Sequence, residues 1–343
     1  MLAPTPAHAG PFALGTFSPG GQPPFAGLVV GDQVRDLGDL AGGAAGASTL
    51  TVRRLVEDWD AVLPKLHELA ASKAGSWRPL CDLSVLPPLQ PGQVLQSGAN
   101  FRQHVIDIVM AEAAIEDLRS QEEARAEAEA MMDARAAWGR PYIFIGLASA
   151  ICGAFDDIVL HTRGVQHDWE LELAVVIGRA ARYVPPADAI QYVAGYTICN
   201  DITTRDQVYR PDLKAIGTDW LAAKNAPTFL PTGPFLVPAG VVDDPMDLRI
   251  VLRHNGRTRQ DESTKDMIFD IAHLVSYTSQ MIELRPGDLL LTGSPAGNGA
   301  YWNTFLAHGD VIEAEITGLG LQRNVCVDEV RLQDPLEAPY AGW

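Results

Sequence analysis

Apolar and polar residues alternate in the segment Asp168-Trp-Glu-Leu-Glu-Leu-Ala-Val-Val-Ile177, close to the middle of the chain. A period of two predicts a β-strand over residues 169–177, with alternate side chains on opposite faces. Glu170 and Glu172 then share one face, where their carboxylates repel each other. A bound divalent cation would offset this repulsion, and two ordinary solvated acids on a strand surface are the alternative. The segment alone leaves both interpretations open.

Short apolar runs separated by Gly and Pro recur from Val94 to near the C-terminus. Their lengths are typical of β-strands. The clearest amphipathic helix is predicted over residues 266–281. The predicted fold class is therefore α+β, mainly β. The strand-like runs are 193–199, 235–242, 248–252, 288–292, 311–316 and 325–330.

The chain is predicted to contain a small N-terminal domain over residues 1–90 and a larger domain over residues 91–343. The first part holds only short apolar pieces and no candidate chemistry, and it ends in the turn-rich connector Leu86-Pro-Pro-Leu-Gln-Pro-Gly92. The change of pattern after this connector sets the predicted boundary.

One segment of the second domain departs from the strand-like pattern. Residues 106–138 are rich in Ala, Glu and Arg and contain no Gly or Pro, so we predict a helical insertion over residues 106–140. A solvated helix or helical hairpin is one interpretation. A mobile lid over a site is the other, because the segment directly follows His104.

The net charge and composition of the chain exclude several classes of binding partner. The 343 residues carry a formal net charge of −17, which argues against binding to nucleic acids or anionic membrane surfaces. No apolar stretch reaches the roughly 18 residues of a membrane span, and residues 1–25 lack the features of a signal peptide. The four scattered cysteines are expected to be reduced thiols. We therefore expect a cytoplasmic protein without a nucleic-acid or membrane partner.

A third candidate carboxylate is Asp201, which follows Asn200 at the end of a strand-like run. Together with Glu170 and Glu172 it would suit a hard cation such as Mg²⁺ or Mn²⁺, with Ca²⁺ as a further option. Asp201 could equally cap the N-terminus of a helix.

His104 and Asp107 are spaced as neighbours on one face of a helix. A carboxylate beside an imidazole fixes its tautomer and raises its basicity, which gives a general base for deprotonating water. An ordinary surface contact between the two side chains is the alternative.

Two further segments could bind an anionic substrate. Lys224 precedes a strand start rich in Pro and Gly, although a lone lysine is usually solvated. The loop in Leu291-Thr-Gly-Ser-Pro-Ala-Gly-Asn-Gly299 offers backbone N–H groups and hydroxyls, with Gly293 and Ser294 as the candidates for substrate contact. That loop could also be only a turn.

Taken together and in this order, these segments resemble the fumarylacetoacetate hydrolase family, from about Val94 to the C-terminus. The motifs that carry the resemblance are Asp168-Trp-Glu-Leu-Glu-Leu-Ala-Val-Val-Ile-Gly178, Val193-Ala-Gly-Tyr-Thr-Ile-Cys-Asn-Asp-Ile-Thr-Thr-Arg-Asp206, Pro231-Thr-Gly-Pro234, Leu291-Thr-Gly-Ser-Pro-Ala-Gly297 and Gly318-Leu-Gly-Leu-Gln-Arg-Asn-Val325. The resemblance implies a catalytic domain with a mixed β-sandwich or β-roll, often dimeric, and a Mg²⁺ or Mn²⁺ site. The implied metal ligands are Glu170, Glu172 and Asp201.

The resemblance also implies the remaining roles in the site. His104 would be the catalytic histidine, with Asp107 as its acidic partner, and Lys224 the active-site lysine. Arg205 matches an arginine of the family motif, and Ser294 matches its Thr or Ser in the Gly-Thr-Pro loop.

Several positions depart from the family pattern. Val208 stands where a glutamine often follows the Arg-Asp pair, and Asp107 is shorter than the usual Glu. The common Phe-x-Lys appears as Phe144-Ile-Gly146, so a lysine that frequently contacts substrate is absent. The missing lysine and the longer helical insertion together indicate a substrate whose tail is bulkier or less anionic than that of a simple dicarboxylate.

The main functional hypothesis is a metal-dependent hydrolase that cleaves a C–C bond in a 1,3-dicarbonyl acid such as an acylpyruvate, in the catabolism of aromatic or related compounds. The expected partners are a small 2-oxo or diketo acid and a second copy of the chain. A 2-oxo acid decarboxylase, a tautomerase or isomerase, and a hydratase are alternatives that use the same metal and enolate. A non-catalytic relic of the fold is disfavoured by the complete set of candidate side chains.

Overall fold

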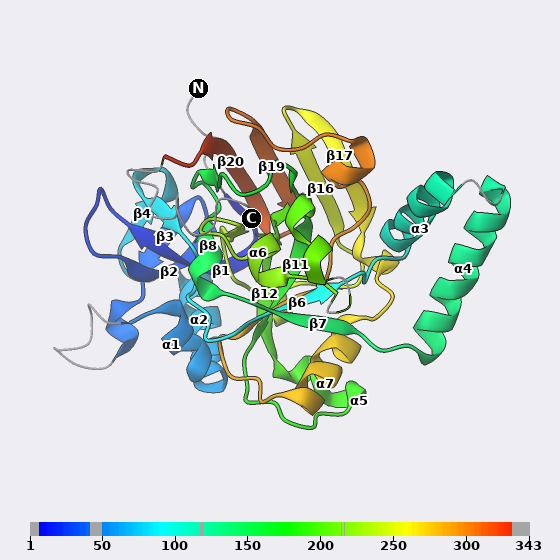
Figure 1. The fold of residues 1–343 in the computed structure, drawn as a ribbon. Coiled ribbons are helices and arrows are strands. Elements are labelled where there is room, and N and C mark those ends of the chain that lie inside the picture. Colours follow the sequence, from blue (N-terminus) through cyan, green and yellow to red (C-terminus); the bar gives the residue numbers. More distant parts are fainter. Residues whose placement is uncertain (1–6, 42–49, 117–119, 214, 216, 331–343) are drawn as a thin grey trace.

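The computed structural model describes residues 7–41, 50–116, 120–213, 215 and 217–330. Strands dominate this part of the chain, and helices flank the sheets (Figure 1). The α+β, mainly β class predicted from the sequence is confirmed. Residues 1–6 of the predicted N-terminal domain, and 331–343 at the other end, lie outside the described residues.

The largest sheet contains eight strands and lies at the centre of the molecule. Its strands are β6 (Val94–Gly98), β7 (Tyr142–Gly146), β8 (Ile151–Gly153), β11 (Leu171–Ile177), β12 (Val193–Asn200), β14 (Leu230–Thr232), β15 (Val237–Pro238) and β18 (Leu289–Leu291). Their order is β7-β6-β18-β11-β12-β14-β8, with β15 also paired to β12. Strands β11 and β12 are antiparallel, with Leu171 opposite Asn200.

A five-stranded sheet covers one face of the central sheet. Its strands are β9 (Ile158–Leu160), β16 (Arg249–His254), β17 (Arg257–Ser263), β19 (Val311–Ile316) and β20 (Gly320–Asp328), in the order β17-β16-β19-β20-β9. Leu171 and Leu173 of β11 share a buried core with Ile250 and Ile312 of this sheet. A two-stranded sheet pairs β10 (His167–Asp168) with β13 (Thr203–Thr204). The alternation read from the sequence therefore orients one side of β11 towards this core.

The N-terminal part of the chain covers the opposite face. It forms a sheet in the order β4-β3-β2-β1-β5. Its elements are β1 (His8–Ser18), β2 (Phe25–Gly31), β3 (Gln33–Asp36), β4 (Trp77–Pro79), β5 (Ser84–Leu86), α1 (Val52–Glu57) and α2 (Trp59–Ser72). Leu14 and Leu28 share a second core with Ala174 and Val176 of β11. Since this core joins both parts, the domain boundary near residue 90 stays a prediction.

Several predicted elements have different bounds in the structure. The run 325–330, for example, overlaps the end of β20, which begins at Gly320 and ends at Asp328. The run 235–242 contains only β15 and a following 3₁₀ turn, because Pro238 has no N–H to donate to a sheet. The helix predicted from residue 266 is α7 (Ile271–Met281), which begins where the Asp270 side chain accepts a hydrogen bond from His273 N. The remaining short helices are α5 (Pro186–Ala189), α6 (Trp220–Lys224) and α8 (Gly299–Trp302).

The helical insertion is a hairpin of α3 (Arg102–Glu116) and α4 (Gln121–Trp138). It starts before the predicted residue 106, so His104 lies inside the first turn of α3. Ser120 and Glu123 cap α4 reciprocally, and Val105 packs with Met132 between the two helices. Figure 1 shows α4 projecting from the side of the molecule beyond α3. A lid function for this hairpin stays a prediction.

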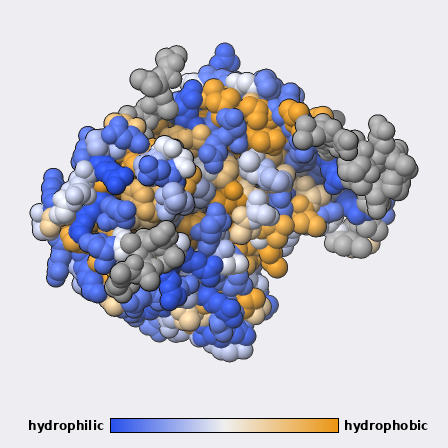
Figure 2. All heavy atoms as spheres, turned by 90° about the vertical axis from the view of Figure 1, so that its left-hand side faces the viewer, coloured by the Kyte–Doolittle hydropathy of each residue, from blue (hydrophilic) through white to orange (hydrophobic). Residues whose placement is uncertain are grey.

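The surface combines polar cover with exposed apolar residues near one sheet edge. On the face shown in Figure 2, hydrophilic residues predominate and apolar ones gather in separate patches. The edge strand β7 carries Ile145, which is 72% exposed, and follows Trp138, which is 89% exposed. Within the described residues, no helix has the length and apolar character of a bilayer-spanning segment. The homodimer, which could cover the β7 edge, stays a prediction.

Candidate metal centre and active site

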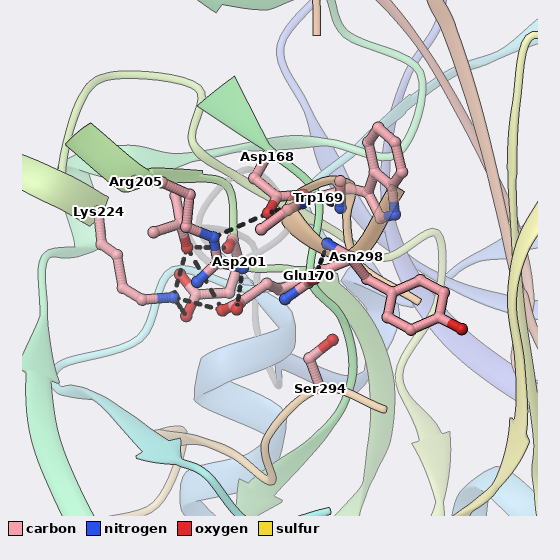
Figure 3. A network of polar contacts seen from close by, with 12 residues as sticks. Asp168, Trp169, Glu170, Asp201, Arg205, Lys224, Ser294 and Asn298 are labelled. Carbon is pink, nitrogen blue, oxygen red and sulfur yellow. Dashed lines mark hydrogen bonds and ion pairs between the residues drawn. The ribbon is translucent and has the colours of Figure 1, made fainter. Parts of the chain in front are cut away.

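Three buried carboxylates meet at the ends of two central strands, and Figure 3 shows two of them, Glu170 and Asp201. Glu170, Glu172 and Asp201 each offer an oxygen, and these atoms lie within 4.8 Å of one another. Glu172 lies on β11, Glu170 just before it, and Asp201 just after β12. The antiparallel register brings them together, since Asp201 N donates to Glu170 O at 2.8 Å. The structure thus collects the three predicted ligands in one place, and the solvated-strand alternative does not apply because all three are buried.

Glu172 is the carboxylate that lacks a cationic partner. Gly293 N donates a 2.7 Å hydrogen bond to its Oε2, and among the described residues no basic side chain forms an ion pair with it. Burial raises the pKa of Glu172 well above its ordinary value, and the charges of Asp201 and Glu170 add to this increase. A cation bound beside Glu172 would reverse that penalty.

Lys224 bridges the other two carboxylates from the last residue of α6. Its Nζ donates to Glu170 Oε2 at 2.6 Å, to Thr203 Oγ1 at 2.7 Å and to Asp201 Oδ2. Burial opposes the charged form of Lys224, but the neighbouring carboxylates outweigh it and raise the pKa of the ammonium. Burial likewise raises the pKa of Asp201 to about 6, even though Lys224 lowers it. The ammonium is therefore placed to neutralise part of the negative charge.

Arg205 forms a second bridge on the other side of Glu170. Its Nη2 donates to Glu170 Oε1 at 2.5 Å, and its Nε donates to Asp168 Oδ2 at 2.8 Å. Burial alone would raise the pKa of Glu170, but the charges of Arg205 and Lys224 hold it below its ordinary range. Asp168 is fixed in turn by the amides of Gly299 and Ala300 at the start of α8. Arg205 thus orients a predicted metal ligand, and substrate contact by Arg205 stays a prediction.

His104 reaches the same site from α3, but its predicted partner does not contact it. Burial lowers the pKa of His104 to about 4. The negative charge of Glu170 raises this pKa, and the positive charges of Arg205 and Lys224 lower it. Its imidazole is therefore neutral near pH 7. Asp107 instead accepts a 2.6 Å hydrogen bond from Gln103 Nε2, and no hydrogen bond joins it to His104 in the described part of the chain. His104 is thus buried close enough to Glu170 and Lys224 for their charges to act on its imidazole, whereas Asp107 pairs with Gln103.

The loop after β18 places Gly293 and Ser294 beside the carboxylates. Gly293 has a φ of 95°, and a Cβ there would lie 2.9 Å from the Cβ of Asn100, so glycine is required. Its backbone N–H donates a hydrogen bond to Glu172. Ser294 Oγ accepts from Gln260 Nε2 at 2.9 Å, and Figure 3 shows its hydroxyl directed towards the polar network.

Sequence reasoning missed two buried glutamines that support this arrangement. Gln260 accepts from Leu171 N at 3.1 Å and donates to Pro295 O at 2.8 Å, which ties β11 to the loop that contains Ser294. Gln96 donates to Asp201 Oδ1 at 2.6 Å. In the sequence, each glutamine is only a polar residue within or beside a strand-like run. Such residues are too common for the sequence to single out either one.

A cavity of about 390 Å³ lies beside the site. It shares α3 with His104, through Asp107, and it shares the loop of Ser294, through Ala296 and Gly297. Its lining residues are Gln103, Asp107, Thr258, Arg259, Asp261, Glu262, Ala296, Gly297, Tyr301 and Trp302. This space is large enough for the tail of a small acid.

The donor set fits a hard divalent cation. All three ligand side chains are carboxylates, which Mg²⁺, Mn²⁺ and Ca²⁺ prefer. Glu172, buried next to two other acids without a cation of its own, is the observation that favours a metal over a purely structural ion-pair cluster. Glu170, Glu172 and Asp201 would hold the ion.

A protein-family model described as Fumarylacetoacetate (FAA) hydrolase C-terminal matches residues 93–327. The chain belongs to the fumarylacetoacetate hydrolase family. A relative from Dictyostelium discoideum, a homolog of fumarylacetoacetate hydrolase domain-containing protein 2, is 34% identical over 253 residues, which are 71% of this chain and 73% of the relative. The family resemblance inferred from the sequence motifs is therefore confirmed.

Two other relatives of this protein carry names that describe different activities. A mitochondrial oxaloacetate tautomerase from Bos taurus is 41% identical over 189 residues, and a 2,4-didehydro-3-deoxy-L-rhamnonate hydrolase from Sphingomonas sp. is 42% identical over 186 residues. The matches cover 54% and 53% of this chain, and the chain spans 59% and 64% of the two relatives. The relatives of this family protein thus include both hydrolases and tautomerases.

A solved structure agrees with the fold. The fumarylacetoacetate hydrolase from Exiguobacterium antarcticum has a TM-score of 0.70 with this chain at 25% identity. The match covers 93% of this chain and all of that one. The predicted fumarylacetoacetate hydrolase-like fold is confirmed.

Proposed function

We propose that this protein is a metal-dependent hydrolase that cleaves a C–C bond in an acylpyruvate-type 1,3-dicarbonyl acid. The observation that carries the proposal is the convergence of three buried carboxylates with a neutral His104 and with Lys224. The named activity of the Sphingomonas relative, a hydrolase, supports hydrolysis as the reaction class. We place the reaction in the catabolism of aromatic or related compounds.

The residues of this chain would divide the chemistry among them. Glu170, Glu172 and Asp201 would hold Mg²⁺ or Mn²⁺, which supplies a Lewis acid for the 2-oxo end of the substrate and for the developing enolate. His104, neutral at pH 7, is placed to take a proton from the water that attacks the distal carbonyl. The C–C bond then breaks: its electron pair goes to the pyruvate carbon, which takes the proton held by His104, and the acyl part leaves with the water oxygen as a carboxylic acid. Lys224 contributes positive charge where negative charge develops.

The substrate tail would extend into the neighbouring cavity. That space is bordered by three carboxylates, Asp107, Asp261 and Glu262, and by one cation, Arg259. Arg249 pairs with Asp261 from outside the lining, so Asp107 and Glu262 face the single charge of Arg259. The predominance of negative charge disfavours a second carboxylate on the tail. We therefore expect a monoanionic acylpyruvate as a better substrate than a dicarboxylate.

A tautomerase acting on a 2-oxo acid is the second candidate. It is favoured by one observation, the absence of a hydrogen bond between His104 and Asp107, because moving a proton between carbon and oxygen needs a base but no activated water. The named activity of the bovine relative is also oxaloacetate tautomerisation. Decarboxylation and hydration use the same set of residues, and no contact in the site favours them.

A spectrophotometric assay would separate these functions. The protein is treated with a chelator, reloaded with Mn²⁺ or Mg²⁺, and assayed with acylpyruvates of increasing tail length and with oxaloacetate. We expect metal-dependent loss of the enol absorbance of the acylpyruvate together with release of pyruvate. Fast enol–keto conversion of oxaloacetate without pyruvate release from any acylpyruvate would favour the tautomerase.

Two variants serve as controls for this assay. Glu172→Ala should abolish metal binding and turnover together. Asp157→Ala removes an exposed carboxylate outside the site and should change neither. Wild-type turnover by Glu172→Ala would overturn the metal assignment.

A further inference from the structure

Both carboxylate oxygens of Asp201 accept hydrogen bonds, one from Lys224 and the other from Gln96. Gln96 on β6 is fully buried, and its Nε2 donates a 2.6 Å hydrogen bond to Asp201 Oδ1. The other oxygen, Oδ2, accepts from Lys224. The two contacts together set the orientation of the carboxylate. Because the Gln96 donor is a neutral amide, it does so without adding charge to the site.

Gly146, the last residue of β7, provides the space that Gln96 occupies. A Cβ at position 146 would lie 2.7 Å from Oε1 and 3.0 Å from Cδ of Gln96. Atoms this close must move apart. Val94, the cross-strand partner of Gly146, would also be crowded, at 2.9 Å from Cγ1. A side chain at position 146 and the present position of Gln96 are therefore incompatible.

The backbone does not itself require glycine at this position. Gly146 lies within a strand and is not among the residues with positive φ. Glycine in a strand weakens it, because the chain loses entropy and packing. The steric contacts with Gln96 and Val94 account for a residue that is otherwise unfavourable there.

The position of the Gln96 amide depends on this arrangement. Its Oε1 is buried and has no hydrogen-bond partner among the described residues. The contact with Asp201 is therefore the only side-chain hydrogen bond that fixes the amide in the described structure. Displacing Gln96 would remove the hydrogen bond to Oδ1 of Asp201 and leave the carboxylate held only through Oδ2.

We propose that Gln96 is a positioning residue for the metal ligand Asp201, and that Gly146 permits this role by leaving space for the Gln96 side chain. The proposal rests on the metal site of the proposed function. It explains why this chain has glycine where the motif Phe-x-Lys has a lysine: a lysine at position 146 would displace the amide that orients Asp201.

Calorimetric titration of the chelator-treated, full-length protein with Mn²⁺ tests the role of Gln96. Gln96→Met keeps the length of the side chain and removes the donor, so we expect Mn²⁺ binding to weaken by about 10- to 100-fold. Gln322→Met is a matched control, because Gln322 is also fully buried and donates to three backbone carbonyls. It should lower the midpoint of thermal unfolding and leave the Mn²⁺ affinity unchanged.

A double-mutant cycle tests the link to Gly146. Gly146→Ala should weaken Mn²⁺ binding in the wild-type background, because it displaces Gln96, and should have no further effect on affinity in a Gln96→Ala background. Crowding of Val94 would lower thermal stability in both backgrounds and is measured separately. If Gln96→Met does not fold, Gly146→Ala alone provides the test, since it moves the amide without removing it.

The possible outcomes separate this inference from the proposed function. Wild-type protein that binds Mn²⁺ together with unchanged affinity in Gln96→Met overturns only the role of Gln96. Equal losses of affinity from Gly146→Ala in both backgrounds overturn only the link between the two residues. Wild-type protein that does not bind Mn²⁺ overturns the metal site and this inference with it.

Discussion

The ammonium nitrogen of Lys224 lies 2.6 Å from Oε2 of Glu170 and also contacts Asp201. One lysine thus binds two of the three carboxylates that would hold a metal ion. The site therefore keeps part of its negative charge neutralised even when no ion is bound. Lys224 forms no ion pair with Glu172, which is left without a cationic partner among the described residues.

Replacing Lys224 by methionine should make the fold depend more strongly on metal. Loss of one partner from a buried ion pair costs about 3–5 kcal/mol of unfolding free energy, so the chelated variant should unfold at a lower temperature. Added Mn²⁺ should recover more stability in the variant than in the wild type. Turnover should fall by about 10²- to 10³-fold. Thermal unfolding with EDTA and with Mn²⁺ checks the first point, and equal gains in both proteins would contradict it.

Glu172→Gln should stabilise the chelated protein while it abolishes Mn²⁺ binding. The folded pKa of Glu172 is raised above its ordinary value of 4.5. The stability associated with its protonated form is therefore present below about pH 4.5 and is lost as the pH rises through the folded pKa. The advantage of the variant over the wild type in EDTA should be larger at pH 8 than at pH 5. Urea unfolding at the two pH values measures this, and a constant difference would contradict the charge argument.

Asp107→Asn tests whether the acid assists His104 once substrate is bound. Catalytic hydrogen bonds are often long or absent before substrate binds, and general-base assistance contributes about 10²- to 10⁴-fold. We expect hydrolysis to slow by about 10- to 10⁴-fold. Asp157→Asn makes the same change at an exposed carboxylate outside the site and should not slow it. Unchanged hydrolysis in Asp107→Asn would leave His104 acting alone and favour the tautomerase.

Gln260→Leu should affect stability and substrate binding together. The variant leaves Leu171 N and Pro295 O, both bonded to Gln260 in the wild type, without these partners. Each unsatisfied buried group costs about 1–3 kcal/mol, so the free energy of unfolding should fall by a few kcal/mol. Because Ser294 loses its donor, the substrate KM should rise more than the Mn²⁺ dissociation constant. Steady-state kinetics with parallel calorimetry measures both, and an unchanged KM would separate Gln260 from the substrate loop.

The amino-acid sequence predicted much of the fold around the site. The alternation from Asp168 to Ile177 predicted which side chains of β11 share a face, and the observed cores confirm that division. Strand β19 has the predicted bounds. The bounds of α7 and of the segment containing β15 were wrong, because a cap at Asp270 and the missing N–H of Pro238 decided them locally.

The sequence could not predict the contacts that complete the site. Gln96 binds a carboxylate that lies 105 residues away in the chain, and Gln260 bonds to Leu171 across 89 residues. A buried amide in a strand has no periodic signature, because its partner depends on how separate elements pack. The spacing of His104 and Asp107 allowed a contact, but the packing of α3 buried His104 and left Asp107 with Gln103.

The sequence by itself determined the residue types that can bind a hard cation and the strand that presents two of them, since both follow from local chemistry and a period of two. Tertiary structure decided which charges neutralise one another. The register of β11 against β12 brings Asp201 to Glu170, and the end of α6 directs Lys224 between them. Electrostatic energy depends on distances across the whole fold, and these distances are set only when the sheets and helices pack together.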